Sequence, residues 1–407
     1  MKICFCSLLL PNEKELLSKT KSKLSFSRHK FGMSVLEGVE ENLKNDITVM
    51  NIINTVNFPK YKQLLFPTQR WSHNGQSKNF HIGYINLFGI KYLMQRSNLK
   101  RHLKKWIRQQ PANEPLIIYV QDMYFPSVTA ALSVSKKYAN VKTCLMTGDL
   151  NGKYGLAPDS NPLKNKLIRL KDDYINKKIK QFNSFVLVTK YMADAMEVSD
   201  YPFTVMECLY SADQNHFSEI KNENHTEKTI FYAGALREEY GIIHLLRAFS
   251  LIKEENYRLL LAGGGDAVDD IKNYEKKDSR IKYLGFIAPS DVTAYQNAAD
   301  VLVNPRTSEH EFVKYSFASK NMECLASGKP YIAHKLPCNP PEYDEYIQYP
   351  DNDSDEALKD KIIEVCNMDA LQKDLLCKKS RDFILNEKNP KNQCAKIVQM
   401  LKKISEE

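Results

Sequence analysis

Short apolar runs alternate with stretches of helical periodicity, and this alternation constrains the fold more than any other feature of the sequence. In the second half, the apolar runs lie at Thr229–Tyr232, Arg258–Ala262, Ile281–Leu284, Asp300–Val303 and Tyr331–Ala333. Between the first two lies Gly241–Lys253, whose apolar residues recur at helical spacing. Strands that alternate with helices of this length predict a parallel sheet covered on both faces.

The first half repeats the alternation with longer loops. Its candidate strands are Lys2–Cys6, Thr48–Ile52, Leu116–Val120, Lys142–Met146, Ser184–Thr189 and Thr204–Cys208. Two such sheets predict an α/β protein with two doubly wound, Rossmann-like domains, at residues 1–210 and 211–385. The polar run Ser211–Glu227 is the expected connection between them. Residues 386–407 are expected to form a terminal helix that packs back on the first domain, through Ala395, Ile397, Val398, Leu401 and Ile404.

Composition excludes several classes of protein. A hydrophobic share of 43% and a charged share of 26% are typical of a soluble globular chain and exclude disorder as the main state. The nine cysteines show no pairing or zinc-binding pattern, which predicts reduced thiols in a reducing compartment. The apolar start Ile3–Leu10 is shorter than a membrane span and stops at Pro11, so a buried strand is expected there rather than a signal peptide.

Basic residues are concentrated in the first half of the chain. Residues 1–200 hold 31 Lys and Arg against 15 Asp and Glu, whereas the remainder holds 27 against 34. No acidic residue occurs between Asp46 and Glu114, where aromatic residues are interspersed among the bases. This pattern fits an anionic membrane surface, a nucleic acid, or a solvated face above buried aromatics. The candidate surface residues are Lys100, Arg101, Lys104, Lys105 and Trp106.

The segment Asn304–Pro330 is the richest in groups able to bind a ligand. It follows an expected strand and enters an expected helix at Lys320–Ser327, which Gly328 terminates. A helix that starts there points its free N–H groups into the crevice at the strand ends, where a diphosphate binds well. Ser316 and Ser319 offer hydroxyl groups, Arg306, Lys314 and Lys320 offer positive charge, and Glu323 is placed to accept ribose hydroxyls. The alternative is that Ser319 is only a helix cap and Glu323 only a solvated helix residue.

This segment resembles the donor-binding signature of retaining glycosyltransferases of the GT-B fold, in the large group called family 4. The match is to the pattern K-Y-S-F-P-S-K-x-x-E-Y-x-A-S-G-K-P of polysaccharide-assembly members. It covers Lys314, Tyr315, Ser316, Phe317, Ser319, Lys320, Glu323, Ala326, Ser327, Gly328, Lys329 and Pro330. The family's Glu-x7-Glu motif places the ribose-binding glutamate on Glu323 and the sugar-contacting glutamate on Tyr315. We therefore expect Glu309 or Glu311 to replace the sugar contact, or the contact to be absent.

Further stretches resemble the same family. Ile230–Ile242 is similar to a strand and turn that read Gly-Arg-Leu and then Lys-Gly, which places the turn glycine on Gly234. Ala235 and Tyr240 occupy the positions of the two diphosphate-binding bases, and Arg237 is the expected replacement. Leu259–Asp266, with Gly264, resembles the glycine turn under the nucleotide.

In the first half, Cys144–Tyr154 resembles a Thr-Asp-Leu-Pro strand end and places Asp149 at its acid. Asp149, Asp122 and Glu207 are candidates to orient an acceptor hydroxyl, or are ordinary loop acids. The acidic run Asp351–Glu356 lacks the glycine and glutamate of a calcium loop, so a helix-capping surface loop is expected.

The resemblance implies a hexosyltransferase that needs no metal and no cofactor. It would move sugar from a UDP- or GDP-sugar to a lipid-linked glycan acceptor, with retention of configuration, in cell-surface polysaccharide synthesis. The expected location is cytoplasmic, at the inner face of the plasma membrane, with Glu311 and Asp149 as the catalytic candidates and no nucleic acid as partner. The alternatives are a GT-B-fold nucleotide-sugar epimerase, a degenerate non-catalytic subunit, and a nucleic-acid binder.

Overall fold

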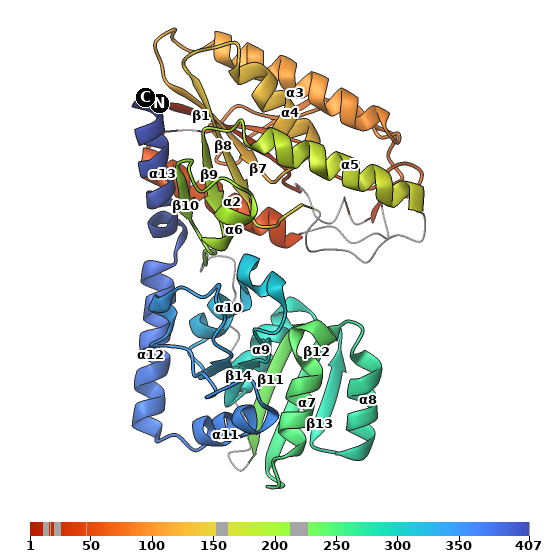
Figure 1. The fold of residues 1–407 in the computed structure, drawn as a ribbon, viewed down its shortest axis with the longest axis vertical. Coiled ribbons are helices and arrows are strands. Elements are labelled where there is room, and N and C mark those ends of the chain that lie inside the picture. Colours follow the sequence, from red (N-terminus) through yellow and green to blue (C-terminus); the bar gives the residue numbers. More distant parts are fainter. Residues whose placement is uncertain are drawn as a thin grey trace. The chain divides into compact units, whose positions relative to one another are not determined.

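The computed structural model describes residues 1–10, 16, 18, 19, 26–45, 47–151, 162–211 and 227–406. The chain divides into two compact units, each with its own parallel sheet (Figure 1). Unit 1 comprises Met1–Leu209 and Pro390–Glu407, and unit 2 comprises Tyr210–Asn389. The expected connection around Ser211–Glu227 falls mostly outside the described residues.

Unit 1 is built on an eight-stranded sheet in the order β10-β9-β8-β7-β1-β2-β5-β4. Its strands are β1 (Lys2–Ser7), β2 (Thr48–Asn51), β4 (Gln69–Trp71), β5 (Asn79–His81), β7 (Leu116–Gln121), β8 (Val141–Thr147), β9 (Ser184–Leu187) and β10 (Phe203–Val205). All neighbours are parallel except β4 and β5. A separate antiparallel pair joins β3 (Leu65–Phe66) to β6 (Tyr84–Ile85).

Helices cover both faces of the unit 1 sheet, as the alternation predicts. Figure 1 shows α3 (Ile90–Arg108), α4 (Phe125–Ser135) and α5 (Pro162–Ile179) on one side. On the other side, α2 (Phe26–Leu43) packs against α13 (Pro390–Glu406), and α6 (Tyr191–Ala195) lies near the sheet edge. The start of β1 is buried, as expected of a strand: Ile3 to Cys6 are each at most 3% exposed.

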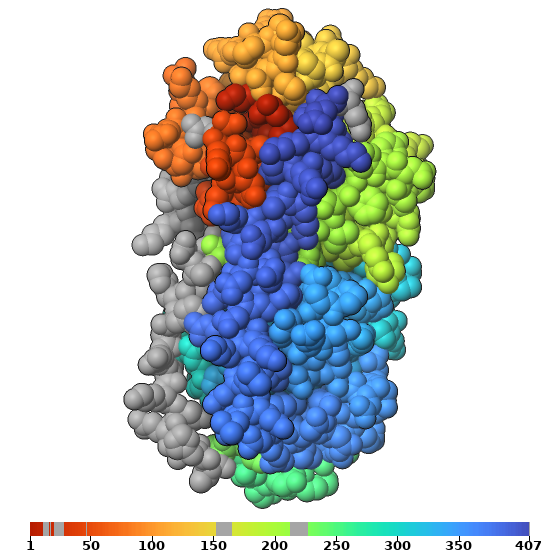
Figure 2. Space-filling view, turned by 90° about the vertical axis from the view of Figure 1, so that its left-hand side faces the viewer, coloured from red at the N-terminus to blue at the C-terminus, as the bar shows by residue number. Residues whose placement is uncertain are grey.

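The C-terminal helix α13 supplies part of the unit 1 core. Figure 2 shows this dark-blue end of the chain lying beside the red segments from the chain's start. Ile397, Val398, Leu401 and Ile404 are buried in one cluster with strands β1, β7 and β8 and with α2. The sequence expectation is wrong at Ala395, which is exposed; Cys394 is buried instead, because Cys394, Ile397, Val398 and Leu401 follow the i, i+3, i+4, i+7 spacing of one helix face.

Gly38 allows α2 and α13 to approach closely. A Cβ atom at this position would lie 2.3 Å from the Pro390 carbonyl oxygen and 2.8 Å from the Cys394 Sγ. We therefore expect Gly38→Ala to lower the free energy of unfolding of unit 1 by about 1–3 kcal/mol, the usual cost of overpacking. Denaturant unfolding measures this loss, and Ala395→Gln on the exposed face of α13 is the control, with no loss expected. A Gly38→Ala protein as stable as wild type would contradict this packing.

Unit 2 is built on a five-stranded parallel sheet in the order β13-β12-β11-β14-β15. Its strands are β11 (Lys228–Ala235), β12 (Tyr257–Gly264), β13 (Ile281–Gly285), β14 (Val301–Asn304) and β15 (Tyr331–Ala333). Its helices are α7 (Ile242–Ser250), α8 (Val268–Lys277), α9 (Pro289–Ala298), α10 (Lys320–Ala326), α11 (Asp355–Cys366) and α12 (Ala370–Glu387). The strands coincide with the five apolar runs of the second half to within a few residues.

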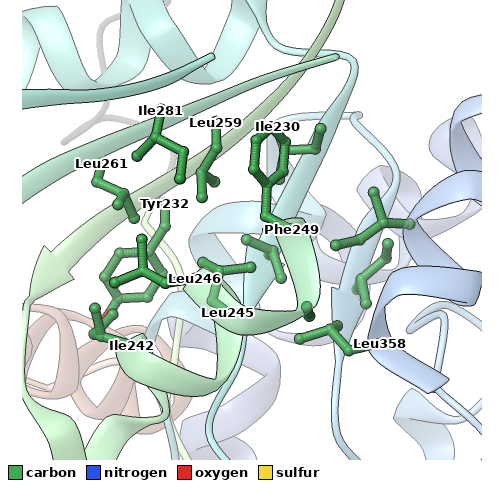
Figure 3. Packing of buried hydrophobic residues seen from close by; sticks show 14 of the residues in the cluster. Ile230, Tyr232, Ile242, Leu245, Leu246, Phe249, Leu259, Leu261, Ile281 and Leu358 are labelled. Atoms are coloured by element: carbon green, nitrogen blue, oxygen red, sulfur yellow. The ribbon is translucent and has the colours of Figure 1, made fainter. Parts of the chain in front are cut away.

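The core of unit 2 forms where α7 packs on the sheet. Figure 3 shows Leu245, Leu246 and Phe249 of α7 beside Ile230 and Leu259 from the strands. Each of these side chains is fully buried, which explains the helical spacing seen in Gly241–Lys253. Ser354 caps α11, because its Oγ accepts a hydrogen bond of 3.1 Å from the Ala357 N–H. The acidic run is therefore the helix-capping loop that the sequence predicts.

No helix within the described ranges has both the length and the apolar character needed to cross a bilayer.

Candidate functional site

Glycines at the carboxyl ends of β11 and β12 bring two backbones into close contact in unit 2. A Cβ atom at Gly263 would lie 1.8 Å from the Gly234 carbonyl oxygen, and one at Gly265 would lie 1.9 Å from that of Leu236. Gly263 also has a φ of +131°, a region that side-chain-bearing residues rarely adopt. Only glycine fits at these two positions, because a Cβ atom there would overlap the neighbouring backbone.

Lys320 crosses this glycine turn from the first turn of α10. Its Nζ donates a hydrogen bond to the Ala233 carbonyl oxygen and lies 5.2 Å from the centroid of the Tyr232 ring. Gly234 makes room for it, since a Cβ there would lie 2.1 Å from Nζ. Burial lowers the pKa of Lys320, and the nearby Glu323 opposes that shift. Among the described residues, no carboxylate forms an ion pair with this ammonium group.

Arg306 is a second cation of unit 2 that forms no ion pair with a carboxylate of the described residues, although Glu239 is near enough to raise its pKa. It follows β14 and is 7% exposed. Its guanidinium carbon lies 5.0 Å from the Tyr240 ring centroid and 4.6 Å from that of Phe312. Burial lowers its pKa, and its Nε has no hydrogen-bond partner in the described part of the chain. A buried, unpaired cation costs folding free energy, so this arrangement suits an anionic ligand.

Both cations belong to the same edge of the unit 2 sheet. Lys320 lies over the Tyr232 ring, and Arg306 acts on the pKa of the same tyrosine, which burial raises. Gly241 has a φ of +80° and lets the start of α7 approach Pro305, the residue before Arg306. A Cβ atom at Gly241 would lie 2.1 Å from the Pro305 carbonyl oxygen. The sequence analysis named both cations, but it did not predict that the Tyr240 and Phe312 rings enclose Arg306.

Arg237, the expected replacement for the family's bases, has a different environment. Its side chain is 47% exposed and lies 3.1 Å from a Glu239 carboxylate oxygen and 3.8 Å from one of Asp266. Two carboxylates therefore neutralise it. The structure makes Arg306, rather than Arg237, the better candidate to bind an anion at this edge.

The remaining predicted donor residues line the segment between β14 and α10. Glu311 begins a short 3-10 helix, Glu311–Tyr315, and accepts a hydrogen bond of 3.1 Å from the Tyr315 hydroxyl. Lys314 is exposed, Ser316 is half-buried, and the Phe317 ring lies 5.5 Å from that of Tyr343. The structure thus links Glu311 directly to Tyr315, the residue at the position of the family's first glutamate.

The start of α10 carries the other predicted contacts. Ser319 immediately precedes the helix but makes no side-chain capping bond, so the structure does not support its alternative role as a cap. Glu323 is exposed in the first turn. Gly264 lies against the Phe286 ring, to which a Cβ would approach within 2.4 Å. The described ranges contain no group of three His, Cys, Asp or Glu side chains placed to hold a metal ion.

In unit 1, two of the three acceptor candidates lie at the carboxyl ends of β7 and β8. Asp122 has a φ of +66° and lies 2.8 Å from Arg28 Nε. Burial raises the pKa of Asp122 to about 6; Arg28 opposes this shift, and the nearby Asp149 adds to it. Asp149 itself is exposed in the turn after β8. Glu207 instead accepts a hydrogen bond of 3.1 Å from Gln393 of α13, so its contacts are structural.

The basic candidates of unit 1 lie on α3, with one correction. Arg101 and Lys105 are exposed, and Lys100 and Lys104 are half-buried. Trp106 is only 6% exposed and cannot form part of a surface. It lies on the inward face of α3 with Leu99 and Leu103, because the helical spacing of these three residues places them on one side. Trp106, although it stands among bases in the sequence, therefore belongs to the buried face of α3 and not to the basic surface.

Comparisons with known proteins relate part of unit 2 to one family. Residues 213–388 match the family model described as glycosyl transferases group 1. The alpha-monoglucosyldiacylglycerol synthase of Streptococcus pneumoniae is 38% identical over 117 residues, which cover 27% of this chain and 25% of that protein. The matched segments span only about a quarter of the length of the curated relatives.

Similar solved structures cover both units. A glycosyltransferase from Rickettsia africae has a TM-score of 0.65 at 14% identity, over 99% of this chain and 98% of that one. An Anabaena protein solved in complex with UDP has a TM-score of 0.60 at 12% identity, over 99% of this chain and 100% of that one. The predicted fold class is confirmed: the chain has the GT-B fold, and its residues 213–388 are similar to the group 1 glycosyl transferases.

Proposed function

We propose that the protein is a glycosyltransferase that moves a sugar from a UDP- or GDP-sugar to a lipid-linked glycan acceptor, with retention of configuration and without a metal ion. One observation carries the donor side of the proposal. Lys320 and Arg306 lie at the carboxyl edge of the unit 2 sheet, and neither is paired with a carboxylate in the described part of the chain. A diphosphate is the anion that such an edge binds in doubly wound sheets.

These two cations also supply a reason for catalysis. When the bond between sugar and diphosphate breaks, negative charge grows on the departing phosphate oxygen. Fixed cations at that oxygen stabilise the transition state more than the ground state, which is commonly the largest catalytic contribution. In the proposal, Glu323 holds the ribose and Glu311, bound to Tyr315, contacts the sugar. The UDP complex of the similar Anabaena structure supports a nucleoside diphosphate as ligand.

The acceptor side of the proposal rests on unit 1. The pneumococcal relative is named for a glucosyl diacylglycerol, which supports a lipid-bearing acceptor here. Asp149 and Asp122, at the carboxyl ends of neighbouring strands, are the groups that we assign to orienting the acceptor hydroxyl. Cell-surface polysaccharide synthesis at the inner membrane face is the process that such an acceptor fits.

A basic and partly apolar surface on unit 1 supports contact with a membrane. Repulsion from Lys104, Arg96 and Lys137 adds to desolvation in lowering the pKa of Lys100, so bases crowd this part of α3. At the other end of the helix, Phe88 is 78% exposed and Leu93 is 65% exposed. Bases attract anionic headgroups, and exposed apolar side chains enter the boundary beneath them.

Neutralising two of the exposed bases of α3 tests this surface. We expect Arg101→Gln combined with Lys105→Gln to weaken binding to anionic vesicles by about 30-fold, because each base near the membrane contributes about 1 kcal/mol. Sedimentation with phosphatidylglycerol vesicles at physiological salt measures it. Lys272→Gln, at an exposed lysine of α8 in unit 2, is the control. Equal sedimentation of the double variant and the wild type would count against the membrane surface.

Glu323→Ala tests the donor site itself. We expect UDP or GDP to raise the thermal unfolding temperature of the wild type. The variant should bind that nucleotide about 10- to 100-fold more weakly, because it loses a charged hydrogen-bond acceptor for the ribose. Glu356→Ala, in the first turn of α11, is the matched control and should bind as the wild type does. A Glu323→Ala protein with wild-type affinity would remove the assignment, and epimerisation of the donor without any acceptor would favour an epimerase.

A further inference from the structure

Unit 1 contains a buried lysine that no part of the proposed function uses. Lys91, in the first turn of α3, is 2% exposed. Its Nζ donates a hydrogen bond of 2.7 Å to the Thr55 carbonyl oxygen, in the loop that follows β2. It also lies 5.0 Å from the centroid of the Tyr92 ring. An ammonium group has three N–H donors, and the Thr55 carbonyl accepts only one of them.

Within the described part of unit 1, no negative charge is paired with this lysine. Among the described residues, no carboxylate forms an ion pair with Lys91, and burial is the only cause that shifts its pKa, lowering it to about 8. The surrounding sequence has no acidic residue from 47 to 113, and α4, which packs on α3, carries no charged side chain. The tyrosines Tyr84, Tyr92 and Tyr124 have pKa values raised by burial, so they stay neutral at physiological pH.

Two further polar groups close to this lysine have no partner. Thr55 Oγ1 and Gln95 Nε2 make no hydrogen bond within the described part of the chain, although Thr55 is 5% exposed and Gln95 is fully buried. Both side chains lie beside the Tyr84 hydroxyl and, as weak hydrogen-bonding neighbours, oppose the rise in the pKa of Tyr84 that burial causes, but neither reaches that hydroxyl with the geometry of a formed hydrogen bond. Unsatisfied buried donors cost free energy, and retaining several around one cation points to a ligand that accepts hydrogen bonds.

The cluster reaches the surface on one side. Gln95 Oε1 accepts a hydrogen bond of 2.7 Å from the Tyr124 hydroxyl, which also lies 3.3 Å from Asn54 Oδ1. Tyr92, Tyr124 and Asn54 are each half-buried, and we call these three residues the rim of the cluster. Asn54 follows β2, and Tyr124 follows β7, so the rim stands at the carboxyl edge of the unit 1 sheet.

We propose that Lys91, Thr55 and Gln95 form an oxyanion site that binds a phosphate or carboxylate group of the acceptor. Lys91 supplies the charge and two N–H donors, while Gln95 Nε2 and the Thr55 hydroxyl supply neutral donors. Charge-assisted hydrogen bonds to such a group compensate for the desolvation of the ammonium. The assignment to the acceptor rests on the proposed function, whereas the binding of an oxyanion at Lys91 does not.

Lys91→Met in the full chain tests the site, because methionine keeps the length of the side chain and removes its charge. Sulfate is the probe, since its charge is constant between pH 6 and 10, and sodium chloride at equal ionic strength is the reference. We expect sulfate to raise the unfolding temperature of the wild type and to bind the variant about 10- to 100-fold more weakly. Lys78→Met, at an exposed lysine of the same acid-free segment, should behave as the wild type does. Equal stabilisation of wild type and Lys91→Met by sulfate, or none in the wild type, overturns the proposal.

Two further measurements distinguish a ligand site from a structural role. Without sulfate, Lys91→Met should unfold at a higher temperature than wild type, because an unpaired buried cation is replaced by an apolar chain. A lower temperature would mean that Lys91 serves the fold. The sulfate effect in the wild type should fade as pH rises from 7 to 9.5, because Lys91 loses its proton, and it should persist in Lys91→Arg. An effect that is independent of pH would overturn the role of Lys91.

A third measurement tests the source of the oxyanion. Glycerol 3-phosphate, a phosphate ester, should displace sulfate from the wild type as inorganic phosphate does. A site that took inorganic phosphate and excluded the ester would overturn the assignment to an acceptor. Nucleotide binding by Lys91→Met should equal that of wild type, because the donor site lies in unit 2. The donor proposal is therefore tested by Glu323→Ala and the oxyanion proposal by Lys91→Met, so the failure of one can be told from the failure of the other.

Discussion

Arg306→Met is expected to lower kcat/KM for the nucleotide-sugar donor by about 10²- to 10³-fold, the usual cost of removing one fixed donor from a developing anion. The guanidinium is enclosed by the Tyr240 and Phe312 rings, is 7% exposed and has an Nε without a partner in the described part of the chain. It is thus fixed before the ligand arrives. Because its charge is unpaired without ligand, the variant should be at least as stable as the wild type.

Steady-state kinetics against Arg237→Met provides the matched comparison. Arg237 is 47% exposed and already lies beside the Glu239 and Asp266 carboxylates, so its loss should lower kcat/KM by less than about 10-fold. Arg306→Lys should recover part of the activity, since it keeps the charge and loses the planar fork. If Arg237→Met proves the more damaging of the two, the diphosphate is bound by the exposed arginine and our assignment is wrong.

Gly263→Ala is expected to lower the free energy of unfolding of unit 2 by about 2–5 kcal/mol, combining the cost of positive φ with that of overpacking. Gly263 has a φ of +131°, and the added Cβ would lie 1.8 Å from the Gly234 carbonyl oxygen. That contact is with backbone and cannot be relieved by rotating a side chain. The edge that carries Lys320 would have to move, so nucleotide binding should weaken as well.

Gly285→Ala separates the two causes. Gly285 also has a positive φ, +71°, but no atom lies within 4 Å of its added Cβ. Its loss should therefore be only the backbone cost of about 1–2 kcal/mol. The free energy of unfolding of both variants is measured by urea denaturation, with far-UV circular dichroism as the signal. Similar losses in the two proteins would show that the close approach of β11 and β12 contributes little.

The strands of unit 2 were predictable because they are buried on both faces. A strand of a covered parallel sheet reads as a short continuous apolar run, and Val301–Val303 and Tyr331–Ala333 do so without interruption. Helix α7 was predictable for the matching reason, since one face packs on the sheet. The strands β4 and β5 were not predicted because Gln69–Trp71 and Asn79–His81 are only three residues long and are mostly polar, so neither forms an apolar run.

The candidate donor site was predictable only in part. The order of residues from Lys314 to Glu323 carries a family likeness, so the segment could be found in the sequence. Nothing in that order says that Arg237 is neutralised while Arg306 is not, since Asp266 and Tyr240 are distant in sequence from Arg237 and Arg306, the arginines that they respectively contact. Trp106 shows the same limit: its neighbours are bases, but its orientation on α3 buries it.

The sequence by itself determined the layered α/β architecture, because burial on a sheet leaves a periodic record in the residues that are buried. It also determined which charged and hydroxyl-bearing residues the segment after β14 offers to a ligand. The tertiary structure alone decided which cations remain unpaired, since an ion pair depends on contacts between residues far apart in the chain. Lys91 and Arg306 stand out among the 58 Lys and Arg residues for that reason: folding buried each of them without an anion in the described part of the chain.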